Sequence, residues 1–455
     1  MLLKKPRTIA LRIFQSAVPR LSFVVAAFII ASAATVSATA APITLPALPE
    51  PVSNNAVASV TIDDTQYVFS FKGLGKGKTH KDVHNRAWQL VINNTDKPSQ
   101  WQALPPVPSS LVLKGRLASV AVGVNDSVYI FGGYTVDEDH NEISTPDVYK
   151  YAPVTGEYTL LTPMPVPVDD ATALVYQDRY VYLISGWHND GNVNLVQVYD
   201  TQTGQWQQAS PFLGSPVFGQ AGGIVNSTMV ICDGVSVTPH SDKRRSFAPE
   251  TACFKGEIDK ENPFKIDWRT LDHPTGSARY RMAAAGNEAT SKIYFVGGST
   301  NPYNYNGIGY NGEPSTADDA IWIFDIAEGT WVISKTEAEA PTMDHRGLIN
   351  VNGSSYTVGG MLGAQLVTSK VIPHFSTLAE MSCLSKSQAN SGASKQALDG
   401  QADEVVKTAP SLKCQHQNLS LIPICRCRRI HRCTSRFFPH PYPHNLSSHT
   451  FSHTP

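Results

Sequence analysis

One pattern of strands recurs along this 455-residue chain and constrains its fold more than any other feature. The clearest copy spans residues 120–165. It reads VAVGV, then SVYIFGG ending at Gly132 and Gly133, then DVYKYAPVTGEYTLL. The unit is therefore a strand of small residues, an aliphatic strand that ends in glycine, a variable connection, and two further strands with aromatic residues. Such repetition predicts an array of structural repeats rather than one irregular domain.

Five weaker copies follow the same order. Their second strands end at glycines spaced about 50 to 65 residues apart, at Gly73, Gly186, Gly234, Gly297–Gly298 and Gly359–Gly360. Three copies also carry aromatic pairs at one shared spacing, namely Tyr151 with Tyr158, Tyr199 with Trp206, and Phe324 with Trp331. An ordinary β-sandwich would not repeat glycines and aromatics at matched offsets.

This pattern predicts a ring of β-sheets. A single four-stranded sheet cannot bury both of its faces, so the units must stack side by side around an axis. Glycine permits a positive φ where a strand turns outward, and the aromatic side chains bury large areas between neighbouring units. The motif resembles the kelch repeat, whose period is about 50 residues. We predict an all-β fold, a six-bladed kelch-type β-propeller over residues 41–375.

The pattern ends after a third strand near Val371, so the last blade lacks its outermost strand. We predict that the segment from Ile43 to Val52 supplies this strand, which would pair the two chain ends and remove exposed strand edges. Cys232 and Cys253 fall on strands expected to be neighbours in the fourth blade. They are a disulfide candidate that spacing alone does not settle.

The N-terminus has the layout of a secretory signal peptide. Basic residues between positions 4 and 20 precede an uncharged run over residues 21–36, and Ala38-Thr39-Ala40 forms a small-residue cleavage site. The alternative is a membrane anchor, but a spanning helix needs about 20 apolar residues. We predict a signal peptide over residues 1–40, a periplasmic or secreted protein, and no membrane attachment after cleavage. An oxidising compartment would allow the disulfide to form.

Residues 376–455 lose the repeat and are predicted to be a low-complexity, disordered tail. A frameshifted end is an alternative, and no function is assigned to the tail. A metal cluster is a further alternative, but its Cys-x-Cys spacing does not match the usual zinc patterns. Its ligands would be Cys425, Cys427, Cys433, His416 and His431.

The long insertions predict where a ligand binds. If the strands of a blade are labelled a to d from the axis outward, the d-to-a and b-to-c connections emerge on one face. Most of the long insertions are b-to-c connections, over residues 72–86, 134–146, 235–249 and 299–319. Loops of this length are usually functional or disordered. We predict that they build a ligand surface around the channel mouth.

The residue types near this mouth favour a sugar, with or without a carboxylate. Several arginines would bind a carboxylate bidentately, although each could instead pair with a neighbouring aspartate. Tyrosines among asparagines suit the faces and hydroxyls of a sugar, but are also common on generic binding surfaces. The ligand-binding candidates are Arg116, Arg244, Arg245, Arg279, Arg281, Arg346, Tyr303, Tyr305, Tyr310 and Trp187.

Three stretches resemble the bacterial periplasmic N-acetylneuraminate mutarotase (epimerase) family. They are SPVFGQAGGIVN at residues 215–226, LPALPEPV at residues 45–52, and the Asn/Tyr/Gly-rich insertion at residues 301–313. The resemblance implies an isomerase that acts on a sugar acid without a cofactor. In that family a glutamate and a nearby arginine are implicated in catalysis. The matching stretch here, CDGVSVTPHSDKRRS, holds Val235 at the glutamate position and offers Arg244 or Arg245 for the arginine.

Two functions remain open. Mutarotation needs a proton donor and acceptor at the anomeric carbon, and the candidates to replace the glutamate are Glu313, Asp170 and His345. The alternative, favoured by Val235, is a non-catalytic propeller that binds a glycan or a protein partner. Galactose oxidase, another kelch relative, needs an adjacent Tyr-His pair for copper, and no such dipeptide occurs here, so no metal or cofactor is expected. The near-neutral net charge of -1 argues against nucleic-acid binding.

Overall fold

The computed structural model describes residues 43–92, 100–335 and 341–376. The predicted signal peptide and nearly all of the predicted tail lie outside these residues. Over the described ranges the only helices are two short 3-10 turns, η1 (His80–Asp82) and η2 (Gly363–Gln365). No helix in this part of the chain is long and apolar enough to cross a membrane.

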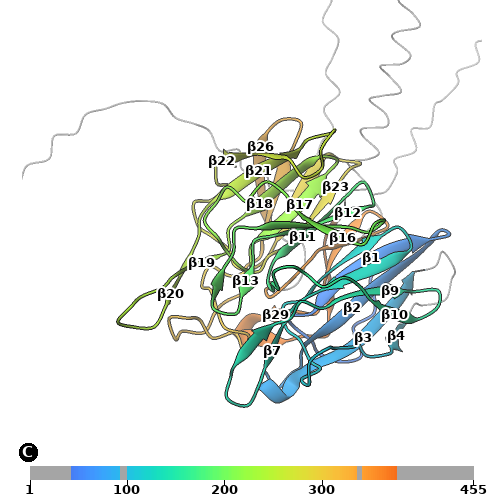
Figure 1. The fold of residues 1–455 in the computed structure, drawn as a ribbon, viewed down its shortest axis with the longest axis horizontal. Helices are drawn as coiled ribbons and strands as arrows, with labels where there is room; N and C mark the ends of the chain where they lie inside the picture. Colours follow the sequence, from blue (N-terminus) through green and yellow to red (C-terminus); the bar gives the residue numbers. More distant parts are fainter. Residues whose placement is uncertain (1–42, 93–99, 336–340, 377–455) are drawn as a thin grey trace, which may run out of the picture. The chain divides into compact units, whose positions relative to one another are not determined.

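Six antiparallel sheets form six blades, which confirms the predicted all-β propeller (Figure 1). Blade one contains β1 (Ala56–Ile62), β2 (Thr65–Leu74), β3 (Val83–Ile92) and β4 (Trp101–Leu104), and blade two contains β5 (Val120–Val124), β6 (Ser127–Phe131), β9 (Val148–Ala152) and β10 (Glu157–Leu160). Blade three contains β11 (Thr172–Tyr176), β12 (Tyr180–Ile184), β15 (Val196–Asp200) and β16 (Gln205–Gln208), and blade four contains β17 (Ala221–Val225), β18 (Thr228–Cys232), β21 (Cys253–Ile258) and β22 (Ile266–Leu271). Blade five contains β23 (Ala283–Asn287), β24 (Lys292–Val296), β25 (Ala320–Asp325) and β26 (Thr330–Lys335), and blade six contains β27 (Ile349–Val351), β28 (Ser354–Val358) and β31 (Val371–Ser376).

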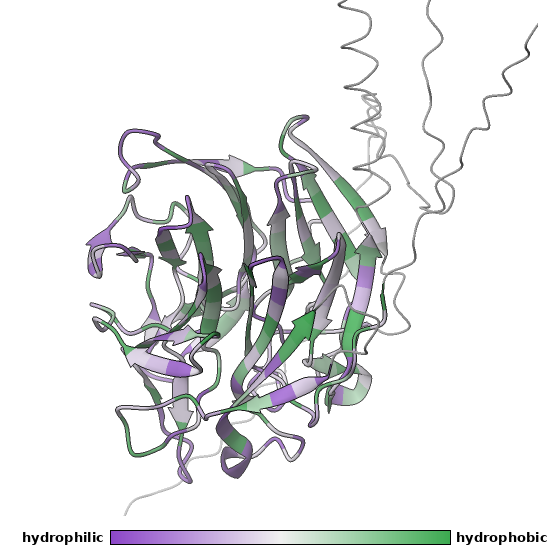
Figure 2. Ribbon diagram, turned by 90° about the vertical axis from the view of Figure 1, so that its right-hand side faces the viewer, coloured by the Kyte–Doolittle hydropathy of each residue, from purple (hydrophilic) through white to green (hydrophobic). Residues whose placement is uncertain are grey.

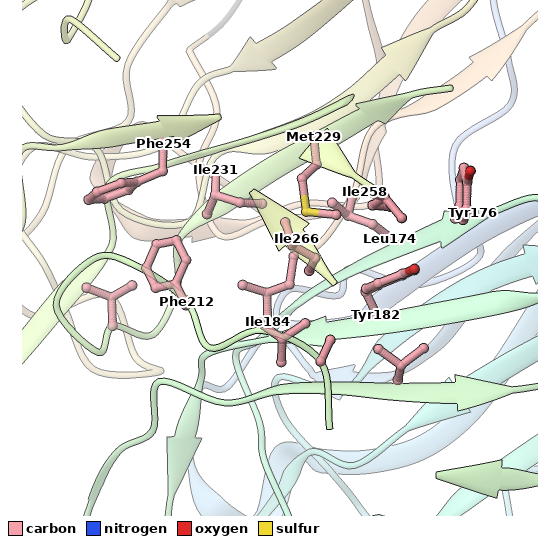
Figure 3. Close-up of a cluster of buried hydrophobic side chains, with 14 residues drawn as sticks. Leu174, Tyr176, Tyr182, Ile184, Phe212, Met229, Ile231, Phe254, Ile258 and Ile266 are labelled. Atoms are coloured by element: carbon pink, nitrogen blue, oxygen red, sulfur yellow. The ribbon is translucent and has the colours of Figure 1, made fainter. Parts of the chain in front are cut away.

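Hydrophobic side chains fill the wedges between blades. Figure 2 shows hydrophobic stretches along many of the strands, and Figure 3 shows one wedge, where Ile184 and Tyr182 of blade three face Ile231 and Met229 of blade four. The predicted aromatic pairs lie directly opposite one another on the two outer strands of their blades. Their ring centroids are 4.8 to 5.0 Å apart. Such pairs contribute about 0.5–1.5 kcal/mol beyond their buried area.

Each blade contributes one residue with left-handed backbone to a ring around the propeller axis. We name this set the axial ring, and its φ values lie between 51° and 71°. The amides of Ala118, Asp170, Gly219 and Arg281 each donate to the ring carbonyl of the preceding blade over 2.8 to 3.3 Å, and the amide of His345 donates to Arg281 over 3.2 Å. The ring therefore links the blades through the backbone. Its members are Asn54, Ala118, Asp170, Gly219, Arg281 and Asp344.

The residue before each ring member pairs with the start of the b-to-c connection in its own blade. This happens in all six blades, and the pairs are Ser53 with Leu74, Leu117 with Tyr134, Asp169 with Trp187, Phe218 with Val235, Tyr280 with Ser299, and Met343 with Met361. The b-to-c connections are thus held at one face, as predicted. We name it the loop face.

Four of the connections on the loop face form two-stranded ribbons. They are β7 (Tyr134–Val136) with β8 (Glu142–Ser144), β13 (Trp187–His188) with β14 (Gly191–Asn192), β19 (Val235–Thr238) with β20 (Ser246–Pro249), and β29 (Met361–Leu362) with β30 (Leu366–Val367). Figure 1 shows β7, β13, β19, β20 and β29 together at its lower left.

The predicted closing strand is not confirmed. The segment of residues 43–52 runs beside blade six and is held by hydrogen bonds from Leu48 N to Ser369 O (2.7 Å) and from Val52 N to Thr368 O (3.1 Å). It is not a regular strand, however. Prolines at positions 46, 49 and 51 lack the N–H groups that a ladder needs. Burial of Leu45 and Leu48 against Tyr356 holds the segment in place instead.

The disulfide candidate is present in the structure. Cys232 ends β18 and lies opposite Cys253, the first residue of β21. The bond therefore joins two adjacent strands of blade four, as their sequence positions suggested.

Gly219 allows a direct test of the axial ring. A Cβ at this position would lie 2.0 Å from the ring of Tyr280, and φ is +65°. We expect Gly219→Ala to lower the free energy of unfolding by about 1–3 kcal/mol more than Gly156→Ala. Gly156 is the matched control because it has φ of +75° and no atom within 4 Å of a built Cβ. Urea denaturation measures both, and equal losses would show that the contact at the ring is unimportant.

Candidate functional site

An apolar layer covers the axial ring on the loop face. We name it the apolar cap. It is built by all six blades, which bring together side chains far apart in the sequence. Its buried members include Leu74, Leu117, Tyr134, Trp187, Phe218, Val235, Tyr280, Tyr303, Met343 and Met361.

A buried ionic cluster occupies the centre of the ring below this cap. Arg281 donates from Nε to Asp170 Oδ2 over 3.0 Å and from Nη1 to Asp344 Oδ1 over 3.1 Å. Arg346 Nη2 lies 2.9 Å from Asp170 Oδ1, and all four side chains are at most 3% exposed. We name these four residues the axial cluster. Two arginines and two aspartates leave it with no net charge.

The two carboxylates of the axial cluster keep Arg281 in its charged state. Burial alone would lower the pKa of Arg281, but the carboxylates of Asp170 and Asp344 hold that pKa well above its ordinary value. The carboxylates also receive hydrogen bonds from Tyr280 and Asn54. Arg281, Arg346 and Asp170 therefore bind one another. These three predicted site residues form the centre of the propeller.

The loops above the cap form a second polar group, which we name the mouth. Arg245 from β19–β20 lies over Trp187 at 4.8 Å from the ring centroid. The Tyr305 hydroxyl is 3.2 Å from His140 Nδ1. Glu142, on β8, interacts electrostatically with both Arg245 and Tyr305. The mouth consists of His140, Glu142, Trp187, Arg245, Tyr305 and Tyr310.

Glu142 is the titratable group that stands out in the mouth. The surrounding loops desolvate its carboxylate and raise the pKa of Glu142 to about 7, although Arg281 and Arg245 act in the opposite direction. Burial raises the pKa of Tyr305, and the charge of Glu142 adds to that effect. At neutral pH the mouth therefore holds a carboxyl group in both protonation states beside a tyrosine that keeps its proton.

The other predicted arginines occupy different surroundings. Arg116 is buried, donates to the carbonyls of Leu113 and Gly115, and supports the loop between blades one and two. Arg279 pairs with Asp318 at 2.9 Å and lies over Trp322. Arg244 is exposed on the β19–β20 connection, next to Arg245.

The predicted catalytic candidates do not meet. Glu313 is exposed on the long loop of blade five, and Asp170 lies in the axial cluster. His345 is buried with Nε2 2.7 Å from the Thr342 hydroxyl, and burial lowers the pKa of His345 to about 3. Val235, which stands where the resemblance places an acid, is fully buried in the apolar cap. Tyr303 lies in the same cap, whereas Tyr310 stacks on Phe247 with centroids 4.0 Å apart.

One group has the composition of a metal site but not its chemistry. Asp233, Cys253 and His273 place possible ligand atoms within 4.8 Å of one another. The sulfur of Cys253 is committed to the disulfide. His273 Nδ1 accepts a hydrogen bond from Gly276 N over 2.8 Å, so the ring proton sits on Nε2, which donates to Asp233. Asp233 and His273 therefore bind each other, and Cys253 binds Cys232, so the group does not offer three ligands to an ion.

Sequence reasoning missed Glu142, which interacts electrostatically with the buried carboxyl of Asp169. Burial raises the pKa of Asp169 well above its ordinary value, and it accepts a hydrogen bond from Ser144 over 2.6 Å. The available signal was the acidic stretch DEDHNE inside the long second-blade insertion. Only the structure shows that Glu142, the last residue of this stretch, lies on the β7–β8 ribbon and interacts with Arg245 and Tyr305.

Comparisons with known proteins agree with this architecture. The kelch motif matches residues 115–165. The human Kelch domain-containing protein 3 is 24% identical over 261 residues, which cover 54% of this chain and 64% of that protein. N-acetylneuraminate epimerase of Salmonella enteritidis is 28% identical over 145 residues, which cover 31% of this chain and 33% of that enzyme. Each alignment thus spans less than two thirds of the relative. The solved structure of YjhT shares the fold, with a TM-score of 0.55, 17% identity, and coverage of 72% of this chain and 95% of that one.

The axial cluster predicts a large cost for removing one charge. Arg281→Met would leave Asp170 and Asp344 short of a buried partner, and we expect a loss of about 3–5 kcal/mol in the free energy of unfolding. Arg179→Met is the control, because Arg179 pairs with Asp200 but is 31% exposed and should lose at most about 1 kcal/mol. Denaturant titration measures the free energy of unfolding of both variants. Similar small losses in the two would contradict the proposed role of the axial cluster.

Proposed function

We propose that this kelch-type propeller is an exported protein that binds a carboxylated sugar at the mouth and interconverts its anomers. The N-terminal signal-like sequence supports export. The match to N-acetylneuraminate epimerase supports a sugar acid as substrate. The observation that carries the proposal is Glu142 on the mouth ribbon β7–β8, with a pKa near 7 and in electrostatic interaction with Arg245 and Tyr305.

The proposed chemistry is a pair of proton transfers. Glu142 removes the proton from the anomeric hydroxyl, the anomeric carbon becomes a carbonyl, and its bond to the ring oxygen breaks. The ring oxygen takes a proton from the Tyr305 hydroxyl. The open chain rotates and recloses with the transfers reversed. A base works best when its pKa lies near the working pH, which Glu142 satisfies.

Arg245 is the proposed anchor for the sugar carboxylate. Its side chain is 39% exposed, so a ligand can reach it. Its stacking on Trp187 and its bond to the carbonyl of Asp190 (2.9 Å) fix its position. A fixed guanidinium loses little freedom when it binds a carboxylate. Tyr310, stacked on Phe247, adds an aromatic surface for the sugar ring.

The alternative is a propeller that binds a glycan or a protein without catalysis. It is favoured by the burial of Val235 in the apolar cap, because this side chain replaces the acid implied by the family resemblance. In this alternative Arg245 and the tyrosines still bind ligand, and Glu142 has no part in chemistry.

Glu142→Gln separates the two functions. NMR of freshly dissolved α-N-acetylneuraminic acid should show accelerated anomerisation with the wild type, rising as Glu142 loses its proton through pH 7. Glu142→Gln should reduce the rate by about 100-fold or more while affinity is kept. Glu138→Gln, an exposed glutamate of the same loop, is the control and should keep the wild-type rate.

Arg245→Ala tests the anchor. It should weaken binding of the sugar acid roughly tenfold or more, because a hydrogen bond to a charged group contributes about 1.5–3 kcal/mol. Binding without any acceleration of anomerisation would overturn the enzyme and leave the alternative. Absence of both binding and acceleration would overturn the mouth as a sugar site.

A further inference from the structure

A second cavity lies along the propeller axis, below the axial ring. Its volume is about 340 Å³, which is within the range of small-ligand pockets. The innermost strands of all six blades line it, and at one end it meets Asp170, Gln220, His345 and Arg346. A second pocket at the a-to-b turns, with a volume of about 530 Å³, shares Ser59 and Gly123 with it and continues it toward the face opposite the mouth. We name this cavity the axial channel.

The walls of the axial channel are rich in backbone hydrogen-bonding groups. Each innermost strand, such as β5 or β17, pairs with only one neighbour in its sheet. Its other edge therefore presents unpaired N–H and C=O groups toward the axis. The side chains along these strands are small, as with Ala121, Ala173 and Ala285. The channel is thus narrow and offers donors and acceptors along its whole length.

The inner end of the channel carries two buried polar atoms without partners. Gln220 donates from Nε2 to Ile184 O over 2.7 Å, which fixes its amide and leaves Oε1 as an acceptor with no donor. Arg346 uses its two terminal nitrogens to bind His345 O and Asn54, and leaves Nε–H as a donor with no acceptor. Gln220 is 6% exposed, and the Arg346 side chain is 3% exposed. Buried polar atoms of this kind usually have a partner, so a ligand is expected to supply one.

We propose that the axial channel binds a slender, neutral polyol that enters from the face opposite the mouth. A hydroxyl group both accepts and donates, so the hydroxyls at the end of a polyol can supply the acceptor that Arg346 Nε lacks and the donor that Gln220 Oε1 lacks. Further hydroxyls along the chain bond to the free strand edges. This site is independent of the proposed sugar site, because the axial ring and the apolar cap lie between them.

The balance of charge at the inner end selects against an anion. The axial cluster already pairs two arginines with two aspartates in a site shielded from water. A carboxylate would add an uncompensated buried charge, which is costly. It would also offer no proton to Gln220 Oε1. The channel and the mouth should therefore differ in selectivity, with a neutral ligand in the first and a sugar acid in the second.

The test compares three probes with saturation-transfer NMR and titration: sorbitol, gluconate and 1-hexanol. They have six carbons each and differ in charge and in hydroxyl content. Sorbitol should bind saturably, and gluconate and hexanol at least tenfold more weakly. Ala173→Leu, which narrows the channel from a half-buried position on β11, should weaken sorbitol binding at least tenfold. Thr159→Leu, on the exposed outer strand β10, should leave it unchanged.

Three outcomes would overturn the proposal. They are no saturable sorbitol binding, gluconate binding as tight as sorbitol, and full sorbitol affinity in a folded Ala173→Leu variant. If Ala173→Leu does not fold, Ala285→Leu makes the same test from blade five, and NOEs between sorbitol and the methyl groups of Val122 and Val175 make it on the wild type. Glu142→Gln and Arg245→Ala should keep sorbitol binding, so this result is separate from the fate of the sugar site.

Discussion

The axial ring is the constraint on which the rest of the structure depends. Six residues with left-handed backbone surround the axis, and only Gly219 among them is a glycine. Five peptide hydrogen bonds join successive blades here, donated by the amides of Ala118, Asp170, Gly219, Arg281 and His345. The left-handed conformation costs other residues about 1–2 kcal/mol each. Two favourable contributions of the ring offset this conformational cost. Its hydrogen bonds satisfy backbone groups at the buried centre, and its side chains place Asp170, Arg281 and Asp344 where their charges cancel.

The same ring divides the propeller into two chemically distinct compartments. On the loop face, each ring member follows a residue that holds the start of a b-to-c connection, so the ring determines where the loops rise. The first residues of these loops pack over the centre as the apolar cap. The polar groups of the mouth lie on the outer parts of the same loops. On the other side the innermost strands run down from the ring and leave a narrow polar channel. One array of hydrogen bonds thus lies between the proposed sugar-acid site and the proposed polyol site.

Much of this architecture could be predicted from local sequence. Glycine at the end of a strand and aromatic residues seven positions apart have local physical causes, so the six blades and the loop face could be predicted from them. The Cys232–Cys253 bond was only a candidate, because spacing does not fix the geometry of a disulfide. The predicted closing strand is not confirmed, because Pro46, Pro49 and Pro51 lack the N–H groups of a regular ladder. The partners of Arg281 could not be read from the chain, since Asp170 and Asp344 come from other blades, 111 and 63 residues away. Glu142 was missed because the groups that interact with it, such as Arg245 and Tyr305, come from other blades.

Native-state hydrogen exchange of the axial-ring amides tests the central claim most directly. The N–H groups of Ala118, Asp170, Gly219, Arg281 and His345 are buried and bonded across blade boundaries. If the ring joins the blades into one cooperative unit, these amides should exchange only through global unfolding, with opening free energies that agree within about 1 kcal/mol and equal the free energy of unfolding. Exchange of individual ring amides at distinct, lower free energies, one blade at a time, would contradict the account.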